Sequence, residues 1–384
     1  MNLKFPIWII VCLVSLFALV GNAAVTLEKL PAGVMQPQIA TASDGTLHLI
    51  YLSGDPKATD VFYQRRGTKE KEWSAPARVN SEKGSAMAIG TIRGAQLALG
   101  PNNRVHVCWN GSSTATPKPK QGGAPMLYAR LSDDGKTFEA QRNLLNVTHD
   151  LDGGGSIAAD GKGNVFVVWH AAPAGLEGET NRAVFLASSS DDGRTFAQER
   201  TISPPRTGAC GCCGLKVSAN NRGEVLVLYR MAGSVMQRDM RLIGSRDVGG
   251  KFEELFSHPW SVNMCPMSTA SIVQDDTGNW ATWETGGHVF AARFSDENKT
   301  KPTFIPIDSP KGSKHPRVVT NHRGETLIVW TEGTGWNKGG ALAWQVFDKN
   351  GKPTDERGRR DGLVRAWSFA APYAPTDGSF VIVY

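Results

Sequence analysis

The sequence predicts an all-β fold of the propeller type, in which four-stranded sheets stand as blades around a central channel. One pattern recurs along the chain: a short apolar strand, a polar turn rich in Asp, Asn and Gly, and a second apolar strand that ends in Trp or Tyr. It returns at intervals of roughly 50 to 60 residues, which is the length of one four-stranded blade. No helical periodicity interrupts it after residue 24. The repeat length and the missing helices together indicate a propeller.

The repeats predict how the ring is built and leave its closure open. The closing aromatics are Tyr51, Trp109, Trp169, Tyr229, Trp283, Trp330 and Tyr384. Residues 36–366 hold six complete four-stranded repeats, and "APYAPTDGSFVIVY" at the C-terminus begins a half repeat. The N-terminal "VTLEKL" supplies one spare strand. Because propellers often close by pairing strands from both ends of the chain, the ring closes either as six blades or as seven with a composite last blade.

The first 24 residues predict a secretory signal peptide. Lys4 precedes the apolar run "PIWIIVCLVSLFALV", and the small residues "GNAA" follow it. This layout is typical of a segment removed after export, and the run is short for a membrane span. We therefore expect a periplasmic or extracellular protein with no retained span and one propeller domain over residues 25–384. Five cysteines remain after Cys12 is removed, in a compartment where disulfides persist.

The composition argues against a nucleic-acid partner. The chain carries 42 Lys and Arg against 36 Asp and Glu, a formal net charge of +6. The basic residues are scattered, with small clusters in "TPKPKQ" and "KNGKPTDERGRR". Nucleic-acid binding instead requires basic residues gathered on one face.

Three turns carry a second repeated motif, and they are "LSDDGKTF" (131–138), "SSDDGRTF" (189–196) and "SRDVGGKF" (245–252). These resemble the Asp-box, or BNR repeat, of the sialidase superfamily. In such a turn an Asp side chain caps backbone amides and a Gly adopts a conformation that other residues resist. The matching residues are Asp133, Gly135, Asp191, Gly193, Asp247 and Gly249. The resemblance implies a sialidase-like propeller, favours six blades, and gives these residues a structural role.

The resemblance also implies a catalytic set to look for. Sialidases of this superfamily use three arginines that hold the substrate carboxylate, a Tyr nucleophile activated by Glu, and an Asp acid/base. Gln38 stands where the first Arg of the "F-R-I-P" motif is expected, so the triad is not intact. The residues that match other parts of the set are Tyr373, Glu284, Glu332, Arg93 and Arg317. Whether the protein is an enzyme is therefore left open, and a glycoside hydrolase acting on glycans is an alternative function.

The most unusual residues fall in loops that lead into the innermost strands, here called mouth loops. The fourth repeat has "TGACGCCG" (207–214) and the fifth has "NMCPMS" (263–268). In a propeller these loops gather at one end of the channel, so residues far apart in sequence converge. The candidate metal ligands are Cys210, Cys212, Cys213, Cys265, Met264, Met267, His149 and His315.

Three chemistries remain open for this cluster. The first is a disulfide, either between Cys265 and Cys212 or Cys213, or within the triplet. The second is a soft-metal site for which copper, as Cu(I), is the candidate ion. The third is a reactive thiol. We expect a non-hydrolytic binding protein whose ligand at the channel mouth is a metal, a glycan or another small molecule. A disulfide-stapled interaction scaffold is the other alternative.

Overall fold

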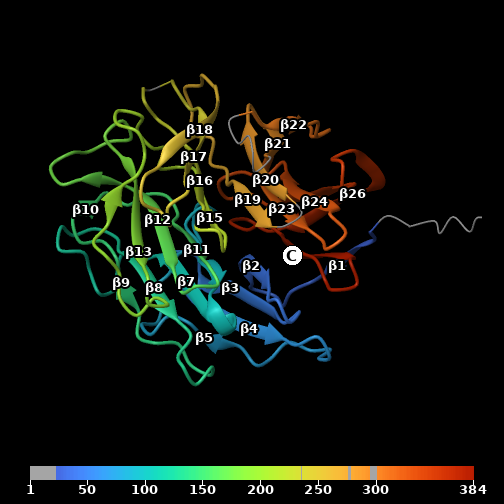
Figure 1. Cartoon of the computed structure of the whole chain (residues 1–384), viewed down its shortest axis with the longest axis horizontal. Helices are drawn as coiled ribbons and strands as arrows, with labels where there is room; N and C mark the ends of the chain where they lie inside the picture. The colour runs from blue at the N-terminus through green and yellow to red at the C-terminus, as the bar shows by residue number, and fades with distance from the viewer. Residues whose placement is uncertain (1–22, 235, 276–277, 295–300) are drawn as a thin grey trace, which may run out of the picture.

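The computed structural model describes residues 23–234, 236–275, 278–294 and 301–384. These residues form seven β-sheets arranged around a central channel (Figure 1). The one helix described is the short 3-10 turn η1 (Pro101–Asn103). None of the described segments is a helix long and apolar enough to cross a lipid bilayer. Most of the predicted signal peptide, residues 1–22, lies outside the described residues.

Blades 1 to 3 follow the predicted repeats. Blade 1 contains β2 (Met35–Thr41), β3 (Leu47–Asp55), β4 (Ala58–Arg66) and β5 (Ala77–Arg78). Blade 2 contains β6 (Gln96–Leu99), β7 (Val105–Asn110), β8 (Met126–Arg130) and β9 (Arg142–Asn143). Blade 3 contains β11 (Ser156–Ala159), β12 (Val165–Pro173), β13 (Ala183–Ser189) and β14 (Arg200–Thr201), and the short β10 (Thr148–His149) also pairs with β12.

Blades 4 to 6 continue the same antiparallel order from the channel outward. Blade 4 contains β15 (Lys216–Ala219), β16 (Val225–Arg230), β17 (Met240–Ser245) and β18 (Glu253–His258). Blade 5 contains β19 (Ser271–Asp275), β20 (Gly278–Thr285), β21 (His288–Phe294) and β22 (Thr303–Ile305). Blade 6 contains β23 (Ser313–Thr320), β24 (Thr326–Glu332), β25 (Gly340–Phe347) and β26 (Pro353–Val364).

The seventh blade is composite, and it closes the ring. It contains β27 (Ala371–Tyr373), β28 (Phe380–Val383) and β1 (Val25–Glu28), and β1 pairs in parallel with β28. The innermost strands β2, β6, β11, β15, β19, β23 and β27 contact one another in turn around the channel. Of the two predicted closures, the seven-bladed one is confirmed. The six-bladed ring favoured by the resemblance is not formed, because β1 pairs with the outer edge of β28 and the two terminal segments make a blade of their own.

The closing aromatics are explained by the packing between blades. One apolar cluster lies at each of the seven junctions, and each closing aromatic contributes to the cluster between its own blade and the preceding one. Trp109 and Trp169 are fully buried there, at the first and second junctions. A repeated aromatic at one strand end therefore stabilises the ring at every junction.

The three Asp-box turns connect the third and fourth strands of blades 2 to 4. The side chain of Asp191 accepts hydrogen bonds from the Thr195 amide at 2.8 Å and hydroxyl at 2.7 Å, and Asp247 accepts one from the Lys251 amide at 3.0 Å. In the first box the capping carboxylate is Asp134, which accepts from the Lys136 amide at 2.8 Å. The predicted Asp133 instead forms an ion pair with Arg104. The motif is thus shifted by one residue because Ser132 hydrogen-bonds Asp134.

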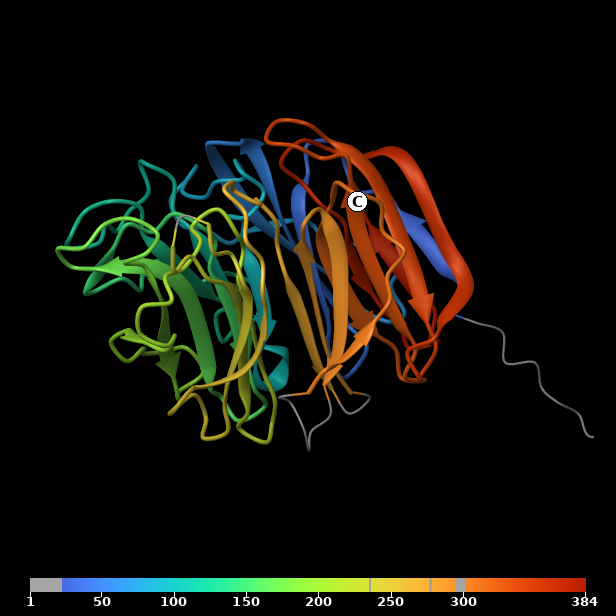
Figure 2. The same ribbon diagram turned by 90° about the horizontal axis from the view of Figure 1, so that it is seen from above.

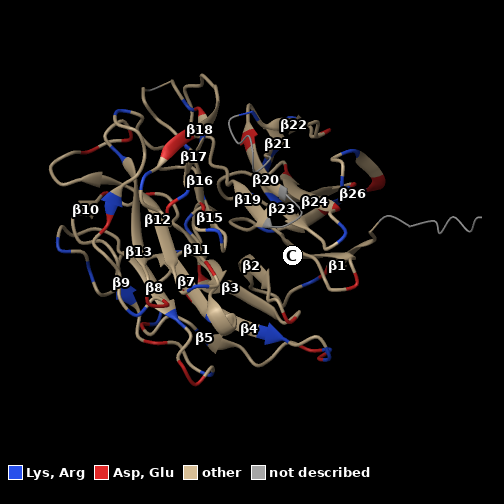
Figure 3. Cartoon of the chain, viewed as in Figure 1, with Lys and Arg blue, Asp and Glu red and all other residues tan. Residues whose placement is uncertain are grey.

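The two faces of the ring carry different loops. In a four-stranded meander, the mouth loop and the loop between the second and third strands lie at the same end, and the Asp-box turns of blades 2 to 4 lie at the opposite end. Figure 2 shows the ring from the side, with the strands crossing from one face to the other. Lys and Arg are distributed over several blades, with Asp and Glu between them (Figure 3).

Candidate metal centre at the channel mouth

The mouth loop between β14 and β15 folds so that three cysteines meet. Gly208 has φ +60°, and a Cβ atom at this position would lie 2.2 Å from the Ala232 carbonyl oxygen. The Cys210 amide donates to the Arg230 carbonyl at 2.9 Å, and the Cys213 amide donates back to the Cys210 carbonyl at 3.3 Å. The Gly214 amide then binds the Ser268 carbonyl of blade 5 at 2.9 Å. These backbone contacts form a tight turn that brings the sulfurs to one side.

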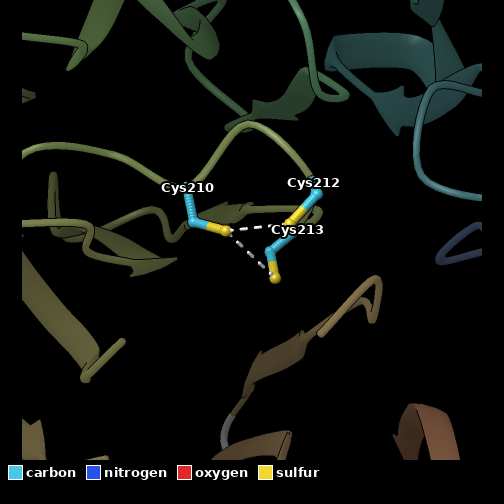
Figure 4. Close-up of side chains that lie close together, drawn as sticks. All are labelled: Cys210, Cys212 and Cys213. Carbon is cyan, nitrogen blue, oxygen red and sulfur yellow. Dashed lines mark hydrogen bonds between the residues drawn. The ribbon is translucent and has the colours of Figure 1, made fainter. Parts of the chain in front are cut away.

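The three sulfurs form a compact group (Figure 4). The Sγ atoms of Cys210 and Cys212 are 3.1 Å apart, and those of Cys210 and Cys213 are 3.7 Å apart. All three Sγ atoms lie within 4.8 Å of one another. Two thiolates bound to one tetrahedral ion at 2.3 Å lie about 3.8 Å apart, so the group has the dimensions of a metal site. Cys210 and Cys213 are buried, and Cys212 is partly exposed.

One sulfur of the group is set apart by its electrostatics. Burial opposes ionisation of Cys213, but hydrogen bonds from Cys210 and Cys212 and the nearby charge of Arg230 lower its pKa well below the usual value. The pKa of Cys212 is raised, first by its hydrogen bond with Cys210 and then by its contact with Cys213 and by burial. Of the three thiols, Cys213 is thus the one whose ionised form its neighbours favour.

Charged side chains from neighbouring loops surround the cluster. Glu179 accepts a hydrogen bond from the Gly211 amide at 3.2 Å and forms an ion pair with Arg238 at 2.8 Å. Arg230 donates to the backbone carbonyl of Glu284 and lies 3.8 Å from its carboxylate. Burial raises the pKa of Glu284 even with Arg230 beside it. Arg230 thus favours ionised sulfur at Cys213, whereas the charge of Glu179 opposes it at Cys210.

A second ion-pair network lies beside the cysteine loop. Arg182 pairs with Asp150 at 2.9 Å and lies 3.6 Å from Asp152. Asp152 also pairs with Arg93, a predicted catalytic residue, at 2.5 Å. A Cβ atom at Gly211 would lie 2.6 Å from the Asp152 carboxylate, so this network contacts the loop between Cys210 and Cys212.

The remaining predicted ligands lie apart from the three sulfurs or face elsewhere. Cys265 and Met264 are exposed, and Cys265 does not join the cysteine group found among the described residues. Met267 lines a small cavity together with His315. His315 is 4% exposed, its pKa is lowered to about 3, mainly by burial, and its ring packs near Phe369. His149 lies in β10, opposite Ala172 of β12.

The predicted disulfides are not formed. All five cysteines in the described part of the chain are free thiols, including Cys108, which is buried in β7. The 3.1 Å between Cys210 Sγ and Cys212 Sγ exceeds the bond length of about 2.05 Å in a disulfide. The close packing within the triplet, without a bridge to Cys265, leaves metal binding and a reactive thiol as the two remaining chemistries.

The predicted catalytic residues are brought together only in part: Tyr373 and Arg317 line the same channel cavity. Tyr373 donates to Glu28 at 3.1 Å and accepts from Arg66 at 2.6 Å, within the junction between blades 7 and 1. Burial raises its pKa above the usual value. Glu332 pairs with Arg359 at 2.6 Å. The carboxylate that Tyr373 contacts is therefore Glu28, which was not predicted as a site residue.

The other three catalytic candidates have separate partners. Glu284 lies beside Arg230, and Arg93 pairs with Asp152. Arg317 lies in β23 with its guanidinium carbon 4.2 Å from the centroid of the Phe369 ring. Among the described residues, no hydrogen bond or ion pair joins any two of the five.

Several residues around the cysteines were missed, although a signal for them exists in the repeats. The residue after the closing aromatic is polar and lies at the mouth end of its strand in four successive blades: Asn110, His170, Arg230 and Glu284, of which only Glu284 was predicted, as a catalytic residue. His170 Nε2 lies 3.1 Å from the Cys213 carbonyl oxygen, and burial lowers its pKa. Aligning the repeats on their closing aromatics would have placed these polar side chains beside the mouth loops.

Comparison with known proteins supports the fold and leaves the function open. No family model matches the chain, and neither does any curated protein. An α-L-arabinanase of Penicillium chrysogenum, in complex with arabinobiose, is 12% identical with a TM-score of 0.51, over 84% of this chain and 95% of that one. A Trypanosoma rangeli sialidase bound to the inhibitor DANA is 12% identical with a TM-score of 0.52, over 86% of this chain and 57% of that one.

A further solved structure is a protein of unknown function from Dyadobacter fermentans, 14% identical with a TM-score of 0.51, over 78% of this chain and 91% of that one. At these identities the likeness establishes a sialidase-like propeller fold. It carries no activity over to this chain.

Proposed function

We propose that this protein binds a soft metal ion, with Cu(I) as the first candidate, through Cys210, Cys212 and Cys213 at the mouth of the propeller channel. The observation that carries the proposal is the meeting of three sulfur atoms within 4.8 Å in one mouth loop. Thiolate sulfur is the ligand type that selects Cu(I), and the loop backbone already holds the sulfurs close together.

The donor set supports Cu(I) over zinc. A structural zinc site takes four ligands, usually Cys or His. Within the described residues, no fourth Cys, His, Asp or Glu donor joins the three sulfurs. A three-sulfur site suits an ion that accepts low coordination and soft ligands. The nearby Arg230 offsets the negative charge that the thiolates bring to a buried position.

Binding is expected to release protons. The pKa of Cys213 is lowered, while the pKa values of Cys210 and Cys212 are raised. Coordination by three thiolates requires thiols to lose their protons, so affinity increases with pH. The proposal includes export, on the strength of residues 1–24, and a binding role without hydrolysis.

The test is a Cu(I) titration of the purified full chain under nitrogen, in competition with a chromogenic Cu(I) chelator. We expect one ion per chain. Each of C210S, C212S and C213S is expected to weaken binding by more than about 100-fold, since even outer-shell partners of a metal typically contribute about 10- to 100-fold. The matched control is C265S, which changes the exposed cysteine of the neighbouring mouth loop.

Two results would overturn the proposal. One is equal affinity in C213S and C265S. The other is a free-thiol count, made on protein from the exported fraction, in which two cysteines of the triplet are oxidised and no metal is bound. Circular dichroism of each variant separates loss of ligand from loss of fold.

A glycan-acting hydrolase is the second candidate, favoured by the fold shared with an arabinanase and a sialidase and by a cavity of about 340 Å³ in the channel. Among the described residues Tyr373 hydrogen-bonds neither Glu284 nor Glu332, and its carboxylate partner is Glu28. Hydrolysis of aryl sialosides or aryl arabinosides, lost in Y373F and retained in C213S, would favour the hydrolase.

A further inference from the structure

The central channel contains a cavity of about 340 Å³, bounded by the innermost strands of blades 1, 4, 5, 6 and 7. In every blade, one residue of the innermost strand pairs with the residue of the second strand that directly precedes the closing aromatic. This common register places the seven innermost-strand residues at the same height in the channel. These seven residues, here called the channel ring, are Gln38, Gln96, Ser156, Lys216, Ser271, Arg317 and Ala371.

The channel ring contains two cations and no acid. Lys216 and Arg317 both line the cavity, and every other lining residue is uncharged. Arg317 is 7% exposed, and its Nε is buried without a hydrogen-bond partner. Lys216 donates to Gln96 Oε1 at 3.2 Å. Among the described residues, neither side chain has a carboxylate within ion-pair distance, unlike the arginines of the cysteine site.

Two partly desolvated cations beside one cavity are unfavourable without an anion. Burial, followed by the charge of Arg317, lowers the pKa of Lys216 to about 8, and burial lowers that of Arg317 to about 10. Buried charges are normally paired, because removing a charge from water costs several kcal/mol. Within the described part of the chain, the favourable contact recorded for the Arg317 guanidinium is with the face of Phe369, at 4.2 Å.

We propose that the channel ring is a binding site for a small oxyanion, which is held between Lys216 and Arg317 and further contacted by Gln38 and Ser271. Guanidinium and ammonium groups are the usual partners of carboxylate and phosphate oxygens, and neutral amide and hydroxyl groups select the remaining polar atoms of the ligand. The site is separate from the cysteine cluster, and its occupancy does not depend on a metal.

The ring also limits what fits. A cavity of about 340 Å³ is at the small end of ligand pockets, so the ligand is a free inorganic anion or a small organic acid. With a single arginine in the ring, the bidentate contact comes from Arg317 and the second charge from the point-like ammonium of Lys216.

The experiment is calorimetric titration of metal-free full-length protein at pH 7 and constant ionic strength, with sodium phosphate, lactate and gluconate as separate probes and chloride as the background. We expect one site. Binding of phosphate alone identifies an inorganic anion, and binding of lactate or gluconate identifies an organic acid. K216M and R317M are each expected to weaken binding about tenfold or more, whereas K162M, which removes an exposed lysine, leaves it unchanged.

Further variants keep the test decisive. R317K retains the charge and is expected to restore part of the affinity lost in R317M, and it stands in for R317M should the latter fail to fold. C213S is expected to bind the anion normally, so failure of the metal site does not affect this result. Absence of binding by all three probes, or equal affinity in K216M and K162M, would overturn the inference.

Discussion

At the scale of single residues, the cluster depends on an unequal distribution of charge among three similar thiols. Burial opposes ionisation of Cys213, but contacts with Cys210 and Cys212 and the charge of Arg230 lower its pKa overall. The cysteines were predicted from the sequence because three within four positions are conspicuous. Arg230 and Glu179 were not: Arg230 ends β16 of the same blade and is marked only by its place after the closing aromatic, and Glu179 lies between β12 and β13 of the preceding blade.

Lys216 provides a test of buried charge through stability. Its folded pKa of about 8 lies below the ordinary value of 10.5, so the unfolded chain binds more protons between these pH values. The free energy of unfolding of the wild type should therefore rise as the pH increases from 8 toward 10.5. Urea unfolding of K216M should lack this rise and should show higher stability at pH 7, by about 1 kcal/mol or more. Parallel pH profiles of the two proteins would show that Lys216 is not desolvated.

At the scale of elements, the strands were predictable and the loops were predictable only in part. Alternating apolar residues and a closing aromatic mark each pair of strands, because every blade must bury both faces against its neighbours. The one-residue shift of the first Asp-box was not predictable, since two adjacent aspartates, Asp133 and Asp134, both fit the motif and only the turn geometry chooses between them.

The cysteine loop depends on the left-handed conformation of Gly208. A methyl group there would meet the Ala232 carbonyl oxygen at 2.2 Å as well as disfavour φ +60°. We expect G208A to lower the free energy of unfolding by about 1–3 kcal/mol and to weaken Cu(I) binding. The matched control is G178A, because Gly178 has φ +85° with nothing within 4 Å of the added Cβ. Equal metal affinity in G208A and G178A would show that the loop tolerates the displacement.

At the scale of the whole molecule, the ring closes through one carboxylate as well as through β1. Glu28 accepts hydrogen bonds from Arg66 at 3.0 Å, Trp73 at 2.9 Å and Tyr373 at 3.1 Å, and so joins the composite blade to blade 1. Repetition in the sequence predicted a composite blade as one of two closures. It could not choose between them, because a half repeat fits either ring.

The Glu28 cluster should appear in acid unfolding. Burial opposes ionisation of Glu28, but the contacts from Arg66, Trp73 and Tyr373 lower its pKa below 4.5 overall. A depressed folded pKa contributes stability that is present above pH 4.5 and is lost as the pH falls through the folded value. E28Q should reduce the free energy of unfolding at pH 7 by about 1–3 kcal/mol and flatten the dependence below pH 4.5. The control is E72Q, which changes an exposed glutamate and should leave the pH profile as in the wild type.

The parallel pairing of β1 with β28 also sets the order of events during biosynthesis. Val25 pairs with Phe380, so the last junction cannot form until the ribosome has made almost the whole chain. Bringing such distant segments together has an entropic cost that slows the step, and the blades made earlier keep an unpaired edge until it occurs. Until Phe380 is made, β1 has no strand to pair with, so the ring stays open at this junction.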